Sequence, residues 1–237
     1  MNTSTALVTG ANKGIGQHIA RQLLAAGLTV HVASRDAERG KRAVAQLDGD
    51  ARLLVLDVTD DASVAAAAAQ VDTLDILVNN AGIMAGSATA PESDVASFRR
   101  TYETNVFGVL RVTNALLPVL RRSAHPRIVN VSSGTGSLGW SAGPEPHFPA
   151  GGGAAAYRSS KTALNALTVF YAQALAAEGF KVNALAPGLR STDLNTRAAA
   201  SDGDPAIGAA GAVRLAMLPD DAPTGYFYSW LGEPMPW

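Results

Sequence analysis

The fold-deciding stretch of this chain is Ala6-Leu7-Val8-Thr9-Gly10-Ala11-Asn12-Lys13-Gly14-Ile15-Gly16, which predicts a strand, a tight turn and a helix. The apolar run stops at Gly10, and apolar residues resume at helical spacing from Ile15. Gly10 would make the sharp turn, Gly14 would let backbone approach a ligand, and Gly16 would let the helix pack on the strand. The unpaired N–H groups of such a helix favour a phosphate. The glycines alone fit a ligand-free loop about equally well, and their place at a strand-to-helix junction favours the ligand.

The composition is that of one large α/β domain spanning residues 1–237. Hydrophobic residues make up 47% and charged residues 16%, and the formal net charge is -1. This balance gives no basic surface for nucleic acid or anionic lipid. Cysteine is absent and the four histidines are scattered, so we expect no metal site. A strand begins within a few residues of Met1 and no apolar run is long enough for a bilayer, so the expected location is the cytoplasm.

Apolar runs alternate with helical patterns along the whole chain. We expect later strands at 29–33, 52–56, 74–78, 127–131, 181–185 and 225–229, and helices that include 60–71, 91–120 in two pieces, and 156–177. The strands are continuous apolar runs, which indicates burial on both faces. The predicted fold is a single-domain Rossmann-type α/β structure: a doubly wound parallel sheet of about seven strands with helices on both faces. Ligands of such sheets bind beyond the carboxyl ends of the strands.

The residues after the second strand bear on cofactor choice. With the strand ending at 33, Ser34 takes the position where an acid would accept from an adenosine ribose, and Arg35 can pair with a 2′-phosphate. Asp36 lies about where the acid of an NAD site is expected, but it also fits the N-cap of the next helix. Lys13 adds a second cation, so NADP is favoured and NAD stays possible. Asp57 is placed to accept from the adenine amino group, or it caps the next helix.

Tyr157 and Lys161 carry the strongest chemical signal. Residues i and i+4 share one helix face, so the phenol and the ammonium should lie side by side. We expect the cation to lower the phenol pKa toward the working range, which makes Tyr157 a general acid. A lone pair of this spacing is more often a surface tyrosine beside a surface lysine.

Together these residues resemble the short-chain dehydrogenase/reductase family over nearly the whole chain, and its carbonyl-reductase-like branch most closely. The motifs that carry the resemblance are Thr9-Gly10-x-x-x-Gly14-x-Gly16, Asn79-Asn80-Ala81-Gly82, Asn105, Ser133, Tyr157-x-x-x-Lys161 and Pro187-Gly188-x-x-x-Thr192.

The resemblance implies four catalytic residues, Asn105, Ser133, Tyr157 and Lys161. Tyr157 would protonate the carbonyl oxygen as hydride arrives, and Lys161 would hold the nicotinamide ribose and tune Tyr157. Ser133 would hydrogen-bond the substrate oxygen, with Ser132 as its competitor. Asn105 would link Lys161 to solvent through water, although it could instead be an ordinary helix asparagine bonded to the main chain.

The resemblance also implies the cofactor site. Asn79 and Gly82 would border the cofactor and firm up the central strands, and Thr192 would meet the nicotinamide carboxamide. The predicted set is Gly10, Asn12, Lys13, Gly14, Ile15, Gly16, Ser34, Arg35, Asp57, Val58, Asn79, Ala81, Gly82, Tyr157, Lys161, Pro187, Gly188 and Thr192.

Two segments are expected to form the substrate pocket as loops, 134–156 and 189–211. The first is unusually long and rich in glycine and proline, and we expect 140–148 to wall the pocket. The predicted pocket residues are Ser133, Trp140, Phe148 and Leu189. No charged cluster in 189–211 demands an acidic substrate, so a small neutral ketone, aldehyde or enone-type carbonyl fits best. The long first loop leaves monomer and homodimer both open.

The predicted function is therefore NADPH-dependent reduction of a small carbonyl compound to an alcohol, in a reversible reaction. A non-catalytic NADP-binding regulator of the same fold is the alternative, and the four intact catalytic residues argue against it. An epimerase or dehydratase of the extended relatives is disfavoured by the spacing from Gly10 to Gly14 and by the lack of an added substrate domain.

Overall fold

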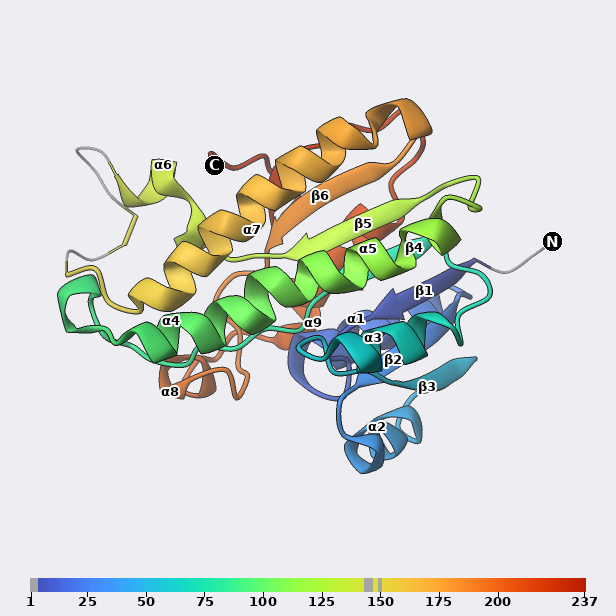
Figure 1. Ribbon diagram of the computed structural model, residues 1–237, viewed down its shortest axis with the longest axis horizontal. Helices are drawn as coiled ribbons and strands as arrows, with labels where there is room; N and C mark the ends of the chain where they lie inside the picture. Colours follow the sequence, from blue (N-terminus) through green and yellow to red (C-terminus); the bar gives the residue numbers. More distant parts are fainter. Residues whose placement is uncertain (1–3, 143–146, 149–150) are drawn as a thin grey trace.

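The computed structural model describes residues 4–142, 147–148 and 151–237. Its centre is a seven-stranded sheet in the order β3-β2-β1-β4-β5-β6-β7, with every neighbouring pair parallel (Figure 1). The strands are β1 (Thr5–Val8), β2 (Thr29–Ser34), β3 (Ala51–Val55), β4 (Ile76–Asn79), β5 (Arg127–Val131), β6 (Lys181–Ala186) and β7 (Phe227–Ser229). The predicted doubly wound parallel sheet is confirmed.

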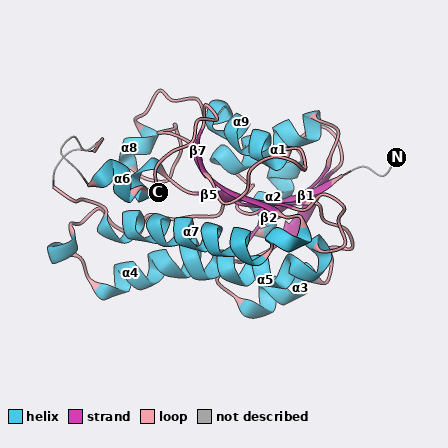
Figure 2. Ribbon diagram, turned by 90° about the horizontal axis from the view of Figure 1, so that it is seen from above, coloured by secondary structure: helices cyan, strands magenta, loops and turns pink. Residues whose placement is uncertain are grey.

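Helices cover both faces of the sheet (Figure 2). One face carries α1 (Gly14–Ala25), α2 (Ala37–Val44) and α9 (Pro205–Ala216), whose apolar side chains pack with β1 and β2. The other face carries α3 (Asp61–Ala68), α5 (Gly108–Leu120) and α7 (Ala155–Ala174). Ala6 and Leu7 point to opposite cores and neither is exposed, which explains the unbroken apolar runs of the sequence.

The predicted helical region 91–120 begins later than expected, and an irregular turn joins its two pieces. It begins as α4 (Val95–Tyr102) because the Asp94 side chain accepts from Ser97 N at 2.6 Å and caps it. A π-helical turn (Glu103–Phe107) then joins α4 to α5. The remaining helices are α6 (Leu138–Ser141) and α8 (Thr196–Ala199), with 3₁₀ turns at Ala90–Glu92, Gly134–Gly136 and Ala176–Glu178.

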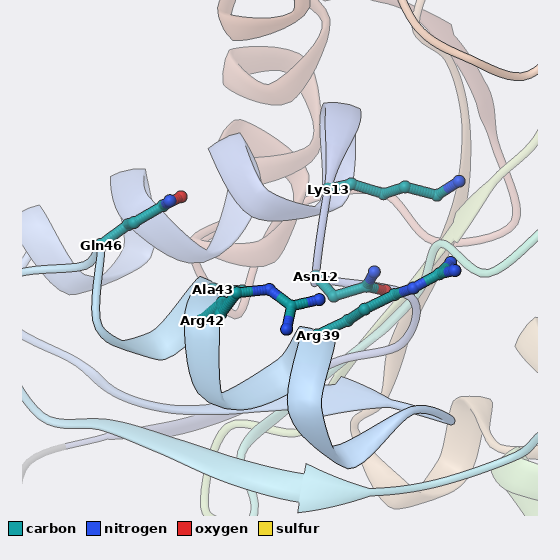
Figure 3. Close-up of a pocket in the computed structure, with 6 residues that line it drawn as sticks. All are labelled: Asn12, Lys13, Arg39, Arg42, Ala43 and Gln46. Atoms are coloured by element: carbon teal, nitrogen blue, oxygen red, sulfur yellow. The ribbon is translucent and has the colours of Figure 1, made fainter.

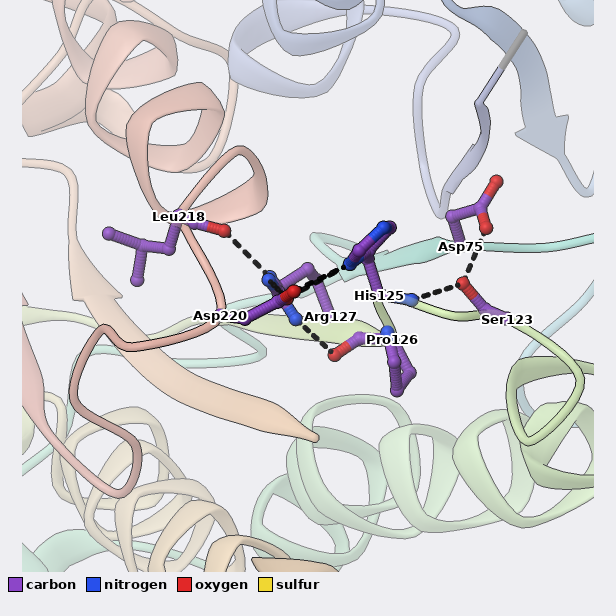
Figure 4. A network of polar contacts seen from close by, with 7 residues as sticks. All are labelled: Asp75, Ser123, His125, Pro126, Arg127, Leu218 and Asp220. Carbon is purple, nitrogen blue, oxygen red and sulfur yellow. Dashed lines mark hydrogen bonds and ion pairs between the residues drawn. The ribbon is translucent and has the colours of Figure 1, made fainter. Parts of the chain in front are cut away.

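A polar cluster surrounds the amino end of β5 (Figure 4). It is remote from residues 10–16, the glycine turn, which follows the carboxyl end of β1. The side chain of Arg127, which is 3% exposed, donates to the Leu218 carbonyl oxygen at 2.9 Å and to Asp220 Oδ1 at 2.5 Å. His125 Nδ1 lies 2.8 Å from Asp220 Oδ2. These contacts tie the start of β5 to the connection between α9 and β7.

Candidate active site

Hydrogen bonds join the glycine turn to the end of β4. They come from side chains that directly follow β1 and β4. Thr9 Oγ1 accepts from the N–H groups of Asn80 and Ala81, each at 2.9 Å. Asn80 Nδ2 donates back to the carbonyl oxygens of Thr9 and Gly10 at 2.8 and 3.2 Å. A Cβ on Gly16 would lie 2.3 Å from Asn80 Nδ2, so only glycine fits there. Gly10 and Gly14 have φ of +62° and +54°, which favours glycine at both turn positions.

The first turn of α1 keeps its backbone donors uncapped. Lys13 is extended at the N-cap position and makes no capping hydrogen bond. Thr192, which follows β6, lies against Gly14, its methyl group 3.4 Å from where a Cβ would be. Asn12 and Ile15 flank this opening and are partly exposed. Uncapped N–H groups beside a backbone without side chains form a cradle that fits a dinucleotide phosphate.

Four cations lie around the end of this cradle. Lys13, Arg39 and Arg42 line a cavity of about 270 Å³ together with Asn12, Ala43 and Gln46 (Figure 3). Arg35 is the exposed residue that directly follows β2. Lys13 forms an ion pair with Asp193, and Arg39 Nε lies 3.6 Å from Asp36 Oδ2. Arg39 and Arg42 were missed from the sequence, although they follow Arg35 at helical spacing on α2.

Two predictions at the end of β2 need correction. The strand runs one residue further than expected, through Ser34, and the Ser34 side chain is buried with its hydroxyl donating to the Asp36 carbonyl oxygen at 2.8 Å. The Ser34 hydroxyl is therefore held by the backbone of Asp36 and is not free in the groove. Asp36 is the N-cap of α2, accepting from Arg39 N at 2.9 Å, which confirms the structural interpretation of that residue.

Asp57 and Val58 follow β3. Asp57 Oδ1 accepts from the N–H and hydroxyl of Thr59 at 2.9 and 2.7 Å, while Asp60 caps α3. Desolvation acts to raise the pKa of Asp57, but hydrogen bonds from Thr59 and the positive charge of Arg35 together hold that pKa below its usual value. Asp57 thus stays an anion with its second oxygen available. Val58 is buried, and its carbonyl oxygen accepts from Arg111 at 2.7 Å.

Tyr157 lies in the first turn of α7 and meets Ser133, the second residue after β5. Burial raises the pKa of Tyr157 to about 12, and a hydrogen bond with the Ser133 hydroxyl opposes that rise. Ser133 Oγ also pairs with Thr135 Oγ1 at 2.9 Å. The competing Ser132 is buried and donates to Asn165 Oδ1 at 2.6 Å, so it is a core residue. The structure therefore brings Ser133, not Ser132, to the phenol.

Lys161 lies one helical turn further along α7 and is 4% exposed. Its ammonium donates to the Val131 carbonyl oxygen at 2.7 Å and lies 5.8 Å from the centroid of the Tyr157 ring. Burial lowers the pKa of Lys161 to about 8. The expectation that this cation pulls the phenol pKa down is wrong for this structure, because desolvation dominates at both groups and the ammonium faces the ring and a carbonyl.

Asn105 reaches the same point from the π-helical turn, and it is fully buried. Its side chain exchanges hydrogen bonds with the backbone of Ile83, at 2.8 and 2.9 Å, and donates to Ser160 Oγ at 3.0 Å. A Cβ on Gly82 would lie 3.4 Å from Asn105 Oδ1 and 3.5 Å from Lys161 Nζ. Gly82 thus lies beside both Asn105 and the Lys161 ammonium. Its neighbour Ala81 lies against the glycine turn, because a Cβ on Gly10 would be 3.1 Å from Ala81 Cα.

Asn79 is placed differently from the other predicted cofactor residues. Its side chain is buried, and its Nδ2 donates to Thr113 Oγ1 at 3.1 Å and to Asn130 Oδ1 at 2.9 Å. Asn130 Nδ2 in turn donates to Thr168 Oγ1 at 2.9 Å. This buried chain joins β4 and β5 to α5 and α7, so the predicted bracing role is present while the side chain faces the core and not the groove.

Comparison with known proteins places this geometry in a family. The family model for short chain dehydrogenases matches residues 4–203. The chain is 34% identical to salutaridine reductase of Papaver bracteatum, over 94% of this chain and 93% of that protein. The structure of NADPH-bound carbonyl reductase from chicken fatty liver matches with a TM-score of 0.83 and 30% identity over all of both chains. This chain is a short-chain dehydrogenase/reductase. It is similar to the carbonyl reductases of that family.

Not every structural relative of this short-chain dehydrogenase/reductase carries the same cofactor. The 3-ketoacyl-(acyl-carrier-protein) reductase from Brucella melitensis, complexed with NADH, matches with a TM-score of 0.81 and 26% identity over 95% of this chain and 96% of that chain. Family membership therefore implies a nicotinamide cofactor, but it does not decide between the 2′-hydroxyl of NADH and the 2′-phosphate of NADPH on the adenosine ribose.

An aromatic wall stands beside Ser133 in this short-chain dehydrogenase/reductase. A Cβ on the adjacent Gly134 would lie 3.1 Å from Trp140 and 3.7 Å from Phe148. Trp140 stacks on His147 with ring centroids 4.5 Å apart, and the Arg158 guanidinium lies 5.6 Å from the Phe148 centroid. Part of the predicted wall, 143–146, lies outside the described residues. Leu189 is 49% exposed, on the segment after β6.

Neither predicted pocket segment is a loop throughout. Segment 134–156 contains α6, which Ser137 caps by accepting from Trp140 N at 3.0 Å. Segment 189–211 contains α8 and the start of α9, capped by Asn195 and Asp204. Asn195 Nδ2 also lies 3.2 Å from Met84 Sδ, so α8 begins beside the segment that follows Gly82. Across the described residues there is no group of metal-ligating side chains and no helix long and apolar enough to span a bilayer.

Proposed function

We propose that this protein reduces small neutral carbonyl compounds to alcohols with NADPH, and that the reaction is reversible. The observation that carries the proposal is the meeting of Ser133, Tyr157 and Lys161 beside the cradle formed by the glycine turn. The nicotinamide, when bound, supplies the hydride that the chain itself cannot supply. The cradle fits such a cofactor, because Gly16 leaves no room for a side chain and α1 keeps its backbone donors uncapped.

Tyr157 is the proposed proton donor. A pKa of about 12 keeps the phenol protonated at neutral pH, so it can donate to a carbonyl oxygen that gains negative charge. Ser133 offers a second hydroxyl to the same oxygen, and the two donors stabilise charge as it develops. The structure thus supports proton donation by a neutral phenol in the reductive direction.

Lys161 and Asn105 are proposed to hold the ribose and to return the proton. The Lys161 pKa of about 8 lets its ammonium release and regain a proton near neutral pH. Asn105, packed against Gly82 and Ser160, lies beside it and can position water that leads to solvent. The remaining proposed cofactor contacts are those of the backbone and side chains at Gly10, Asn12, Gly14, Ile15, Asp57, Ala81, Gly82, Pro187, Gly188 and Thr192.

The cation cluster supports NADPH over NADH. Lys13, Arg39 and Arg42 line one cavity at the edge of the cradle, and Arg35 follows the neighbouring strand. Lys13 and Arg39 already have carboxylate neighbours in Asp193 and Asp36. Together with Arg35 and Arg42 they still offer four cationic side chains to a 2′-phosphate, which a ribose hydroxyl would not engage as charge partners. The NADPH-bound relative supports the same choice.

The pocket wall supports a neutral substrate. Trp140 and Phe148 present aromatic surface beside Gly134, next to Ser133, and Leu189 is exposed on the segment after β6. The relatives named above include a salutaridine reductase and a carbonyl reductase. We therefore infer a ketone, aldehyde or enone-type carbonyl compound without a charged group beside the reacting carbon.

The test is loss of NADPH absorbance at about 340 nm with a panel of ketones, aldehydes and enones. The proposal expects turnover with NADPH and slower turnover with NADH. Tight NADPH binding without turnover on any compound would instead favour a cofactor-binding regulator.

A further inference from the structure

Arg190 lies under the turn that follows β6. It is 9% exposed, and its Nε donates to the Pro187 carbonyl oxygen at 2.7 Å. Its guanidinium carbon lies 5.0 Å from the centroid of the Trp230 ring, on the segment after β7. The side chain therefore folds back beneath its own turn and is clamped by an aromatic ring from the end of the chain.

The same two side chains enclose Gly188. This residue has φ of +77°, and a Cβ on it would lie 2.9 Å from both Arg190 Nη2 and Trp230 Cε3. Arg190 also packs against α9, since a Cβ on Gly208 would lie 3.2 Å from its Cγ. The Arg190 guanidinium and the Trp230 indole thus pack against the Pro187–Gly188 turn and restrict its conformation.

One donor of this guanidinium is unused. Among the side chains of the described residues, Arg190 Nη2 is the buried polar atom with no hydrogen-bond partner. Arg190 is not balanced by a close carboxylate either: burial lowers its pKa, and the charge of Asp204 opposes that shift only in part. A buried unpaired N–H of a charged group is costly, so it calls for an acceptor in some state of the protein.

We propose that Arg190 is a positioning residue for the nicotinamide half of the cofactor. It holds the Pro187 carbonyl oxygen through Nε, and its Nη2 donates to a carbonyl oxygen of the turn once that turn has closed on the nicotinamide. The free protein carries the unpaired donor, and the loaded protein pairs it. This inference rests on the proposed function, because it needs a nicotinamide beside Gly188.

The test compares two ligands on the same variants. NADP⁺ has both halves of the cofactor, whereas adenosine 2′,5′-bisphosphate has only the half that meets the cation cluster. Arg190→Met removes every donor, Arg190→Lys keeps one charged donor, and Arg197→Lys is the matched control on the exposed face of α8. Binding is measured by calorimetry and unfolding of the ligand-free protein by urea.

We expect Arg190→Met to bind NADP⁺ about tenfold or more weakly and to keep its affinity for the bisphosphate. Arg190→Lys should recover part of the loss, and Arg197→Lys should match the wild type with both ligands. A merely structural arginine would instead weaken both ligands alike, or lower the unfolding midpoint with no change in their affinity ratio. Either result would overturn the inference.

A second measurement needs no variant that folds poorly. In wild-type protein with isotope-labelled arginine, NADP⁺ should move the NMR signal of the buried guanidinium, and the bisphosphate should leave it in place. An unmoved signal with NADP⁺ bound would overturn the role of Arg190 and leave the proposed function standing. Failure of the wild type to bind NADP⁺ at all would end both proposals.

Discussion

The Lys161 ammonium lies 5.8 Å from the centroid of the Tyr157 ring while it donates to the Val131 carbonyl oxygen at 2.7 Å. The cation therefore approaches the face of the phenol ring and is anchored to the end of β5. Both groups are desolvated, and their pKa values move in the directions that favour the neutral forms. Desolvation thus favours a phenol that keeps its proton and an ammonium that releases one more readily than an exposed lysine does.

Tyr157→Phe tests the proton donor. The variant keeps the ring and loses the hydroxyl, so NADPH binding should stay near the wild-type value while kcat falls by about 10²–10⁴ or more. The control is Ser159→Ala, two residues further along α7. The Ser159 hydroxyl donates to the Ala156 carbonyl oxygen at 3.2 Å. Wild-type turnover by the phenylalanine variant would remove Tyr157 from the mechanism.

The Lys161 pKa makes a prediction about stability and pH. Burial lowers the folded-state pKa of Lys161 to about 8, below the usual lysine value of 10.5, so between these values the unfolded chain binds more protons than the folded one. Stability contributed at this site therefore rises with pH over that window, by at most about 1.4 kcal/mol per pH unit. Relative to Lys161→Met, the wild-type free energy of unfolding should increase from pH 8 toward pH 10. Urea titrations across this range measure it, and a flat difference would show that Lys161 is not desolvated as described.

Arg39→Ala and Arg35→Ala test the choice of cofactor. If these side chains meet a 2′-phosphate, each substitution should weaken NADPH by about tenfold while it changes NADH little. The NADPH affinity of the wild type should also fall more steeply with salt than that of the variants. Arg21→Ala, an exposed arginine of α1 outside the cavity, serves as the control. Equal losses for NADPH and NADH would show that the cluster does not read the phosphate.

Gly16→Ala tests the packing of the glycine turn. A Cβ at this position would lie 2.3 Å from Asn80 Nδ2 and 2.6 Å from the Gly10 carbonyl oxygen, so the turn must shift. We expect a loss of about 1–3 kcal/mol in the free energy of unfolding, together with weaker cofactor binding. Gly86→Ala is the matched control, since its nearest neighbouring atom is 3.8 Å from the new Cβ. Equal stability of the two variants would contradict the tight contact with Asn80.

Local signals in the sequence were enough to predict the sheet and the glycine turn. Buried strands such as β1 and β4 contain three consecutive apolar residues each, and glycine is favoured where φ is positive, as at Gly10. In the segment after β6 the alanine- and glycine-rich sequence predicts a loop and one short helix before Leu218, whereas the structure has two helices, α8 and α9. Asn195 and Asp204, with Pro205 in the first turn of α9, were nonetheless capping signals.

Other features depend on the tertiary structure and could not be predicted from spacing. The pKa of Tyr157 is raised by burial, whereas the i, i+4 spacing to Lys161 predicts that it is lowered, because spacing does not report burial. The outward-facing Ser133 and the inward-facing Ser132 are neighbours in sequence, and only Asn165 on α7 shows which one belongs to the core. The π-helical turn that presents Asn105 likewise has no local signature, because both it and α4 pack on α7, which lies far along the chain.

The central claim is that a hydride moves from NADPH to a carbonyl carbon held at Ser133 and Tyr157. The most direct measurement supplies NADPH deuterated at the transferable position, together with a ketone that the enzyme turns over, and locates the label in the product. This account predicts deuterium on the carbinol carbon of the alcohol, delivered to one face, with transfer by Tyr157→Phe slowed by about 10²–10⁴ or more. Alcohol formed without deuterium at that carbon, or label transfer that survives loss of the phenol at the wild-type rate, would contradict it.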